Sequence, residues 1–168
     1  MDNQHRNSSI TYHFHITKEV DKIARPRTYT VNENYFNNID TEDKAYWLGF
    51  LYADGYITQR GFGLAVKSED RPHIQKMLDA MDSDYDIKDY VTSTKTKNNY
   101  GEHGYSRVIV SHKQLREKLI QYGMVENKSL ILEPPKIEFG TDELKRHFIR
   151  GFFDGNGSIS GKKEERTH

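Results

Sequence analysis

The spacing of apolar residues along the chain alternates between helical and strand-like periods. Asp40 or Thr41 can cap a helix that contains the apolar run AYWLGFLYA and that ends at Gly55. Residues 56–59 and 62–67 alternate as the two strands of a short hairpin. The first part of the chain therefore predicts a helix followed by two antiparallel strands.

The same sequence of elements follows once more. Ser68 is predicted to cap a second, amphipathic helix. Residues 87–95 and 105–111 read as a longer hairpin, and Ser111 with Gln114 forms a capping box for a third helix. The order helix, two strands, helix, two strands, helix predicts one compact α+β unit.

The chain divides into three regions. Residues 1–28 are polar and basic, with one proline, Pro26, that interrupts regular structure, and are predicted to form a flexible arm. Residues 29–133 carry the α+β unit, and 134–168 a linker and one further helix that Thr141 can cap. The polar remainder after this helix is too short for a second copy of the unit.

An internal repeat links the first and last helices. WLGFLYADGYI at 47–57 matches IRGFFDGNGSI at 149–159, with a period of 102 residues. Small residues lie four apart on one face of each helix, which lets two helix backbones approach closely. The small residues are Gly49, Ala53, Gly151 and Gly155.

The acid at the end of the first helix has unusual chemistry for its place. Asp54 puts a carboxylate at the negative end of the helix dipole, which costs about 0.3–1 kcal/mol. A divalent cation such as Mg²⁺ would compensate, and helix pairing would bring Asn156 alongside as a second oxygen donor. The alternative is that Asp54-Gly55 only ends a helix and begins a turn.

Composition excludes several classes of protein. Lys and Arg number 25, as do Asp and Glu, so a nucleic-acid partner would have to meet a local patch of charge. The absence of cysteine excludes disulfide scaffolds and thiolate zinc sites, and the histidine spacing predicts no zinc site. Without a membrane span or a secretion signal, we expect an intracellular protein. Without a nucleotide-binding loop, we expect no nucleotide cofactor.

The two repeated motifs resemble the signature motifs of LAGLIDADG homing endonucleases (the DOD type). The resemblance extends in order and spacing from about residue 30 to the C-terminus, including the segment GMVENKSLILEPP. It implies a saddle-shaped antiparallel sheet, paired motif helices, and acids that hold Mg²⁺ or Mn²⁺ at the scissile phosphates. One complete half and the truncated start of a second would be present.

The resemblance also implies roles for particular residues. Asp54 occupies the acidic position, with Gly55 beside it at the metal. The matching position of the second motif is Asn156, whose neutral amide lowers metal affinity there. Lys128 matches a lysine near the active centre, although alone it reads as a surface lysine. Asp154 reads as a polar residue at a helix end and is not predicted to bind metal.

Strand residues are the expected DNA contacts, because a β-ribbon fits the major groove. The alternative for any single one is a solvated strand face. The predicted contacts are Tyr56, Thr58, Arg60, Lys67, Lys88, Thr92, Thr94, Lys95, Lys97, Asn98 and Arg107.

The resemblance predicts a sequence-specific, metal-dependent endonuclease for double-stranded DNA, of the kind that mobilises introns or inteins. The alternatives are a DNA-binding or RNA-splicing helper that does not cleave, and an inactive truncated remnant whose last helix exposes an apolar surface. A single-motif enzyme would pair with a second chain through Gly49 and Ala53, which would bring two copies of Asp54 together.

Overall fold

A computed structural model of the chain describes residues 29–96, 99–126 and 135–156, with side chains left undescribed at 94–100. The elements run in the order α1 (Glu42–Ala53), β1 (Tyr56–Ile57), β2 (Phe62–Lys67), a 3₁₀ turn (Ser68–Asp70), α2 (Arg71–Ala80), β3 (Lys88–Thr96), β4 (Asn99–Val110), α3 (Lys113–Gln121) and α4 (Asp142–Asn156). The predicted α+β class and element order are confirmed. The predicted 1–28 arm lies outside the described residues.

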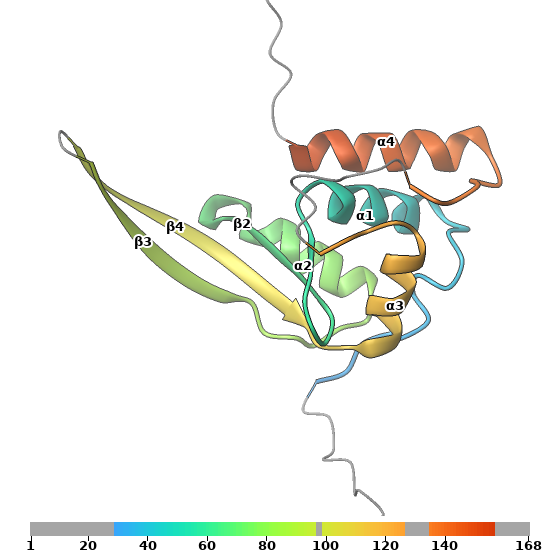
Figure 1. Cartoon of the computed structure of the whole chain (residues 1–168), viewed down its shortest axis with the longest axis horizontal. Coiled ribbons are helices and arrows are strands. Elements are labelled where there is room, and N and C mark those ends of the chain that lie inside the picture. Colours follow the sequence, from blue (N-terminus) through green and yellow to red (C-terminus); the bar gives the residue numbers. More distant parts are fainter. Residues whose placement is uncertain (1–28, 97–98, 127–134, 157–168) are drawn as a thin grey trace, which may run out of the picture.

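One antiparallel sheet holds the four strands in the order β1-β2-β4-β3. Its inner face carries Phe62, Leu64, Val108 and Val110, all buried, and the helices cover that face (Figure 1). Strands β3 and β4 continue as a long two-stranded ribbon beyond the helices. Val91, on the ribbon, is 71% exposed, and among the described residues no helix covers it.

Strand β4 is longer than the sequence pattern predicts. Pairing with β3 runs without interruption to Thr96 and Asn99, so residues 99–104, which the pattern leaves between the two predicted strands, belong to β4. The reason is that backbone hydrogen bonds pair the strands of a solvated ribbon, which requires no apolar alternation. The sequence pattern therefore predicts a shorter ribbon than the structure has.

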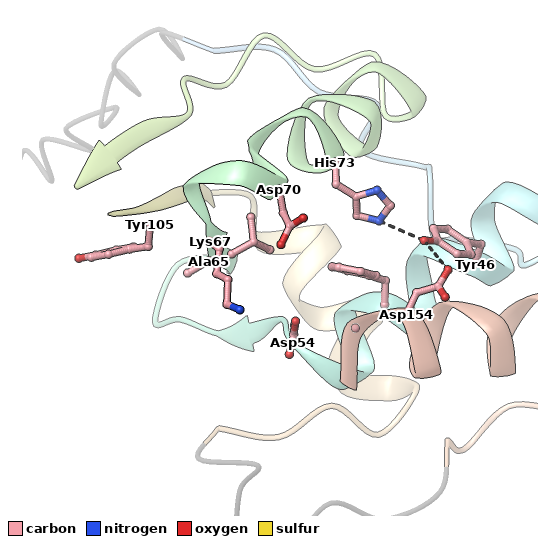
Figure 2. A pocket seen from close by; sticks show the side chains of 11 residues that line it. Tyr46, Asp54, Ala65, Lys67, Asp70, His73, Tyr105 and Asp154 are labelled. Atoms are coloured by element: carbon pink, nitrogen blue, oxygen red, sulfur yellow. Dashed lines mark hydrogen bonds between the residues drawn. The ribbon is translucent and has the colours of Figure 1, made fainter. Parts of the chain in front are cut away.

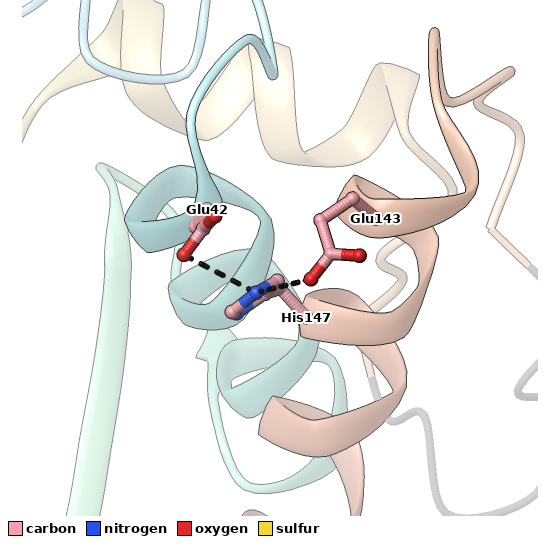
Figure 3. Close-up of side chains that lie close together, drawn as sticks. All are labelled: Glu42, Glu143 and His147. Atoms are coloured by element: carbon pink, nitrogen blue, oxygen red, sulfur yellow. Dashed lines mark ion pairs between the residues drawn. The ribbon is translucent and has the colours of Figure 1, made fainter.

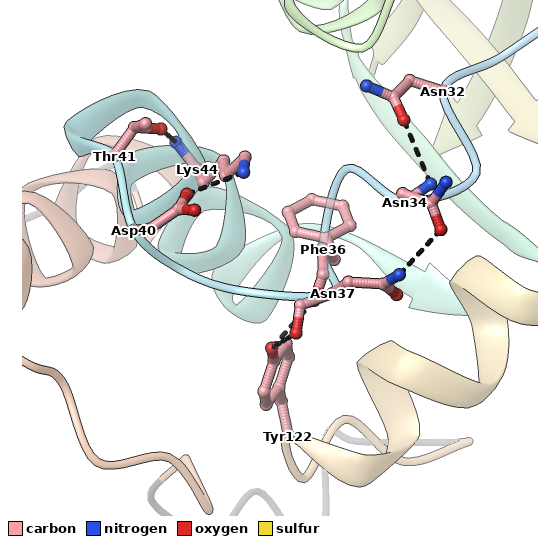
Figure 4. Close-up of polar contacts among 8 residues, drawn as sticks. All are labelled: Asn32, Asn34, Phe36, Asn37, Asp40, Thr41, Lys44 and Tyr122. Carbon is pink, nitrogen blue, oxygen red and sulfur yellow. Dashed lines mark hydrogen bonds and ion pairs between the residues drawn. The ribbon is translucent and has the colours of Figure 1, made fainter.

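Helix α1 is buried on nearly every side, and every residue from Ala45 to Tyr52 is buried. Its N-terminal cap is Thr41, whose hydroxyl accepts a hydrogen bond from the Lys44 amide at 3.3 Å (Figure 4). Asp40 instead accepts from the Lys44 ammonium at 2.7 Å. Helix α1 packs against α4 and shares one buried core with the inner face of the sheet, which explains its lack of a polar face.

The predicted cap of α4 is confirmed, since the Thr141 hydroxyl accepts a hydrogen bond from the Leu144 amide at 3.2 Å, whereas the caps predicted at Ser68 and Ser111 are wrong. Ser68 begins the 3₁₀ turn, and neither α2 nor α3 has a side-chain cap. The N-terminal cap of α3 is His112, and Gln114 donates to the side chain of Asn34 instead of completing a capping box. Tertiary contacts therefore override the local pattern at Ser111.

Helices α1 and α4 lie side by side and parallel (Figure 1). A Cβ built on Gly49 would lie 2.0 Å from the Phe148 carbonyl oxygen, and one on Gly151 would lie 2.0 Å from that of Tyr46. These contacts are reciprocal under the 102-residue period, since Tyr46 corresponds to Phe148. An approximate two-fold axis therefore relates the two repeated helices, as it relates identical units in a symmetric interface.

Two buried tyrosines tie the loop before α1 to the end of α3. The Tyr122 hydroxyl donates to the Phe36 carbonyl oxygen at 2.8 Å (Figure 4). The Tyr52 hydroxyl in turn donates to the Tyr122 carbonyl oxygen at 3.1 Å. Gly123, at φ +106, allows the chain to turn directly beside Tyr52. These bonds fix the position of α1 over the sheet.

Replacing Tyr122 with phenylalanine should lower the free energy of unfolding by about 1–3 kcal/mol, because a buried carbonyl loses its donor. Urea unfolding of the full chain measures this change. Tyr29→Phe is the control, since its hydroxyl bonds to Asp86 at an exposed site and its loss should cost less than about 0.5 kcal/mol. Equal effects of the two variants would contradict the proposed importance of the buried bond.

Candidate functional site

An open pocket of about 730 Å³ lies where the C-terminal ends of α1 and α4 meet strands β2 and β4 (Figure 2). It brings together three carboxylates, one lysine and one histidine, with apolar and aromatic neighbours. The lining residues are Tyr46, Phe50, Asp54, Ala65, Val66, Lys67, Asp70, His73, Tyr105, Asp154 and Gly155.

Helix α1 supplies one wall of the pocket through regular spacing. Tyr46, Phe50 and Asp54 follow one another at intervals of four residues, which places them along one side of the helix. Asp54 is exposed at the C-cap, and its amide donates to the Phe50 carbonyl oxygen at 2.9 Å. The carboxylate therefore sits at the negative end of the helix dipole, as the sequence indicates.

Helix α4 ends directly beside α1. A Cβ on Gly155 would lie 2.7 Å from the Cβ of Ala53 and 3.7 Å from the Asp54 amide nitrogen. Asn156, the last residue of α4, is exposed at this same end. Among the described residues, the pocket lining includes Asp154 and Gly155 but not Asn156.

Asp154 is held in the pocket by a short chain of hydrogen bonds. The Tyr46 hydroxyl donates to Asp154 at 3.0 Å, and the same oxygen lies 3.0 Å from His73 Nε2 (Figure 2). The single phenolic proton is directed to Asp154, so His73 Nε2 must be the donor in the hydrogen bond between Tyr46 and His73. Asp154 is thus a fixed acceptor, a contact that its sequence position did not suggest.

The environment adjusts two of these groups. Burial, and then the hydrogen bond to Asp154, raise the pKa of Tyr46, so it remains a donor at any ordinary pH. Burial, and then the charge of Lys76, lower the pKa of His73 from its ordinary value of 6.5. Asp154 and Asp70 oppose this shift without cancelling it. His73 is therefore neutral at pH 7.

The lowered pKa of His73 predicts a pH-dependent stability. As the pH falls through 6.5, the unfolded chain takes up a proton at this histidine that the folded chain resists, so the free energy of unfolding falls. The loss is complete once the pH is below the folded pKa. His73→Gln should remove this contribution, so the variant should lose less stability than the original chain between pH 7 and pH 5.

Urea unfolding at a series of pH values tests this expectation. His103→Gln is the matched control, because His103 is exposed on β4 and should follow the original chain. If the original chain instead gained stability over His73→Gln on acidification, His73 would have to take up its proton more readily when folded.

The outer face of the sheet adjoins the pocket. Register places Tyr56 opposite Gly63, and Ala65 opposite Arg107, which in turn pairs with Lys88. Directly paired residues share a face, and residues two apart on a strand share it too. Five predicted DNA contacts therefore lie on one face, away from the core: Tyr56, Lys67, Lys88, Thr92 and Arg107.

Aromatic rings organise this face. Tyr90 and Tyr105 stack with their ring centroids 5.1 Å apart. The Arg107 guanidinium lies over the Tyr90 ring, 4.8 Å from its centroid, and donates to the Tyr90 hydroxyl at 3.0 Å. Tyr90 thus lies on the same face as Lys88 and Thr92 and orients the arginine.

Two predicted strand contacts belong to a turn. Strand β1 ends at Ile57, so the assignment of Thr58 and Arg60 to the strand is wrong. The reason is that the Thr58 hydroxyl accepts from the Gly61 amide at 3.0 Å and closes the turn. Arg60 is exposed there. The side chains of Thr94 and Lys95, and all of Lys97, Asn98 and Lys128, lie outside what the structure describes.

Sequence reasoning missed several members of the pocket. The spacing of Tyr46 and Phe50 to Asp54 was a usable signal, because it places them on one side of a helix. Asp70 and His73 gave no comparable signal. They line the pocket because the 3₁₀ turn after β2 places the start of α2 near the end of α1.

Comparison with known proteins gives limited information. No protein-family model matches the chain. The chain is 26% identical over 159 residues to the replication factor C small subunit of Methanocaldococcus jannaschii, an alignment that covers 92% of this chain and 8% of that protein. In the described residues, the search for a helix long and apolar enough to cross a membrane finds none.

Proposed function

We propose that the chain is a divalent-metal-dependent endonuclease of the LAGLIDADG type that hydrolyses phosphodiester bonds of double-stranded DNA at a specific sequence. The observation that carries the proposal is the continuity between the carboxylate pocket and the outer sheet face. Lys67 and Tyr105 belong to both, so DNA lying on that face would reach the acids. The pairing of α1 with α4 supports the same proposal.

The outer sheet face has the features that DNA recognition needs. Two antiparallel strands fit the major groove, and Lys88, Thr92 and Arg107 offer donors to phosphates and base edges. Basic side chains gather there although the whole chain has no net charge. The proposed partner is therefore double-stranded DNA, which would bind to the basic outer face of the sheet although the chain as a whole carries no net charge.

The pocket residues fit a hard divalent cation. Asp54, Asp70 and Asp154 present only oxygen donors in an open pocket, as Mg²⁺ or Mn²⁺ requires. Asp54 with the backbone oxygen of Gly55, and Asn156 of the second motif, are the residues proposed to hold the metal. When bound, such a metal supplies Lewis acidity and an activated water for phosphodiester hydrolysis.

The chain's own groups have supporting roles in this proposal. Lys67 provides positive charge for a phosphate at the pocket. Tyr46 holds Asp154 in one orientation, and Lys128 is proposed to steady charge at the reacting phosphate. We also propose an intracellular setting and a role in intron or intein mobility.

A nicking assay tests the proposed function. Supercoiled plasmid carrying the chain's own genomic locus, without the coding segment, would be incubated with the full chain in Mg²⁺, in Mn²⁺ or in EDTA. We expect nicked or linear DNA only with metal, and none from a plasmid lacking the locus. Scission in EDTA would contradict metal dependence, and equal cutting of both plasmids would contradict sequence specificity.

A second candidate is a DNA-binding or splicing helper that does not cleave. It is favoured by Asn156, because an amide contributes no negative charge to a metal. Locus-specific binding in a gel-shift assay, without scission in any metal, would support this candidate. A third, an inactive remnant, is favoured by Ile149 and Phe153, which are 43% and 55% exposed on α4. Self-association would support it.

A homodimer through the first motif helix would need a rearrangement. Gly49 and Ala53 already contact α4 of the same chain, which occupies the surface that a second α1 would use. A dimer of that kind therefore requires α4 to leave. Sedimentation measurements on the full chain would distinguish a monomer with α4 in place from such a dimer.

A further inference from the structure

A second cluster of metal-ligating groups lies at the opposite end of the α1–α4 pair. Glu42 begins α1, and Glu143 and His147 lie one turn apart near the start of α4 (Figure 3). Helix α1 has 12 residues, so the cluster and the Asp54 pocket are separated by about 18 Å of helix. The two sites are therefore independent.

His147 is directed at both carboxylates. Its Nε2 lies 3.2 Å from Glu42 Oε2 and 3.3 Å from Glu143 Oε1. The histidine side chain is only 14% exposed, whereas the two glutamates are exposed to solvent. The arrangement is thus a partly buried imidazole at the base of a solvent-accessible pair of carboxylates.

A single proton on His147 Nε2 cannot form a good hydrogen bond to both carboxylates of this cluster. A single Nε2–H can donate well to one carboxylate oxygen, but two oxygens approach it at nearly the same distance. If Nε2 is unprotonated, its lone pair faces two negative charges. A divalent cation at the centre of the three atoms would accept electron pairs from all of them at once.

The separations of the donor atoms suit a small cation. All three lie within 4.8 Å of one another. Metal–ligand bonds of about 2.0–2.2 Å in tetrahedral geometry place neighbouring donors about 3.4 Å apart. The two distances from His147 already have this value, so closure requires only small movements of exposed glutamate side chains.

Neighbouring charges orient one of the carboxylates and add negative charge around the cluster. Arg146 binds the other oxygen of Glu143 at 2.6 Å, which leaves Oε1 directed at His147. Asp43 and Asp142 add negative charge in the first turns of the two helices. This negative charge would attract a cation to the cluster.

We propose that Glu42, Glu143 and His147 form a transition-metal site, best suited to Zn²⁺, that joins α1 to α4. An imidazole with two carboxylates selects Zn²⁺, Co²⁺ or Ni²⁺ over Mg²⁺, which takes oxygen ligands. One ligand comes from α1 and two from α4, so the metal bridges the helix pair. Solvent completes the coordination.

Titration of the metal-stripped full chain with Co²⁺, followed by its visible absorption, tests this site. We expect saturation at one equivalent, displacement by Zn²⁺, and no displacement by Mg²⁺. Glu42→Gln and His147→Gln should each weaken Co²⁺ binding at least about tenfold. His103→Gln, on the distant β4 strand, should bind within twofold of the original chain.

Thermal unfolding gives a second readout that does not involve Co²⁺ absorption. Zn²⁺ should raise the Tm of the original chain and of His103→Gln, because it binds only the folded pair of helices, and should leave Glu42→Gln unchanged. Absence of saturable Co²⁺ binding by the original chain would overturn the proposal. So would binding by Glu42→Gln equal to that of the original chain, a comparison that stands even if His147→Gln fails to fold.

Discussion

Replacing Gly151 with alanine is expected to lower the free energy of unfolding by about 3 kcal/mol. The new methyl group would lie 2.0 Å from the Tyr46 carbonyl oxygen and 2.9 Å from its carbon. Both atoms belong to helix backbone, which cannot move aside as a flexible side chain would. The helices would have to separate, and the contacts between α1 and α4 would loosen along their length.

Urea unfolding of the full chain measures this effect, with Gly140→Ala as the matched control. No atom lies within 4 Å of a Cβ at Gly140, so its replacement should change the free energy of unfolding by less than about 0.5 kcal/mol. A Gly151→Ala variant as stable as Gly140→Ala would show that α4 does not pack on α1 in solution.

The double variant Gly49→Ala, Gly151→Ala separates local strain from loss of the helix pair. Each methyl group alone forces the same two helices apart, because the contacts are reciprocal across the approximate two-fold axis. Once the first replacement has separated the helices, the second should cost little, so the two effects should be strongly non-additive. Additive costs would mean that each glycine is accommodated independently.

The helix pair is the part of the fold that the sequence predicted most directly. Gly49, Ala53, Gly151 and Gly155 recur at one interval, and small residues four apart have few other structural uses in apolar helices. The cap of α1 was predicted at Asp40 or Thr41 for a similar reason, since a side-chain oxygen before an apolar run can accept from a free amide, and in the structure the cap is Thr41. Local chemistry therefore predicted the helix pair and the position of this cap to within one residue.

Other features depended on contacts that local chemistry cannot reveal. Ser111 and Gln114 satisfy the pattern of a capping box, but Asn34, 80 residues away, binds Gln114 instead. The Glu143 to His147 spacing of four residues was visible in the sequence, yet Glu42 joins them only because α1 and α4 run parallel. Long-range pairing therefore decided which polar groups met.

The candidate site divides in the same way. Asp54 was predicted as a site residue because a carboxylate at a helix C-terminus is electrostatically unfavourable and because its motif recurs 102 residues later. The contact of Tyr46 with Asp154 joins residues 108 positions apart. His73 reaches them from α2 across the end of β2. The sequence therefore identified the acid, and the surrounding pocket required the fold.

Replacing Asp54 with asparagine is expected to reduce metal-dependent nicking at least about 10³-fold, under the proposed function. The substitution keeps the shape and removes the negative charge, and metal stabilisation of the reacting phosphate is worth several kcal/mol, each 1.36 kcal/mol being tenfold in rate. Asp79→Asn is the matched control, since Asp79 is exposed on α2 outside the pocket and its replacement should leave nicking unchanged.

Stability measurements make the Asp54→Asn result decisive, because the proposed function predicts that activity and stability separate. Because asparagine keeps the shape of the side chain and removes a negative charge from the negative end of α1, we expect Asp54→Asn to remain folded. Nicking lost from a fully folded variant would therefore reflect loss of charge at the pocket. Asn156→Asp adds a carboxylate at the equivalent position of α4, and conversion of nicks into double-strand breaks would assign the second strand to that helix. Nicking that survives in Asp54→Asn would place the reacting phosphate elsewhere and contradict the proposed site.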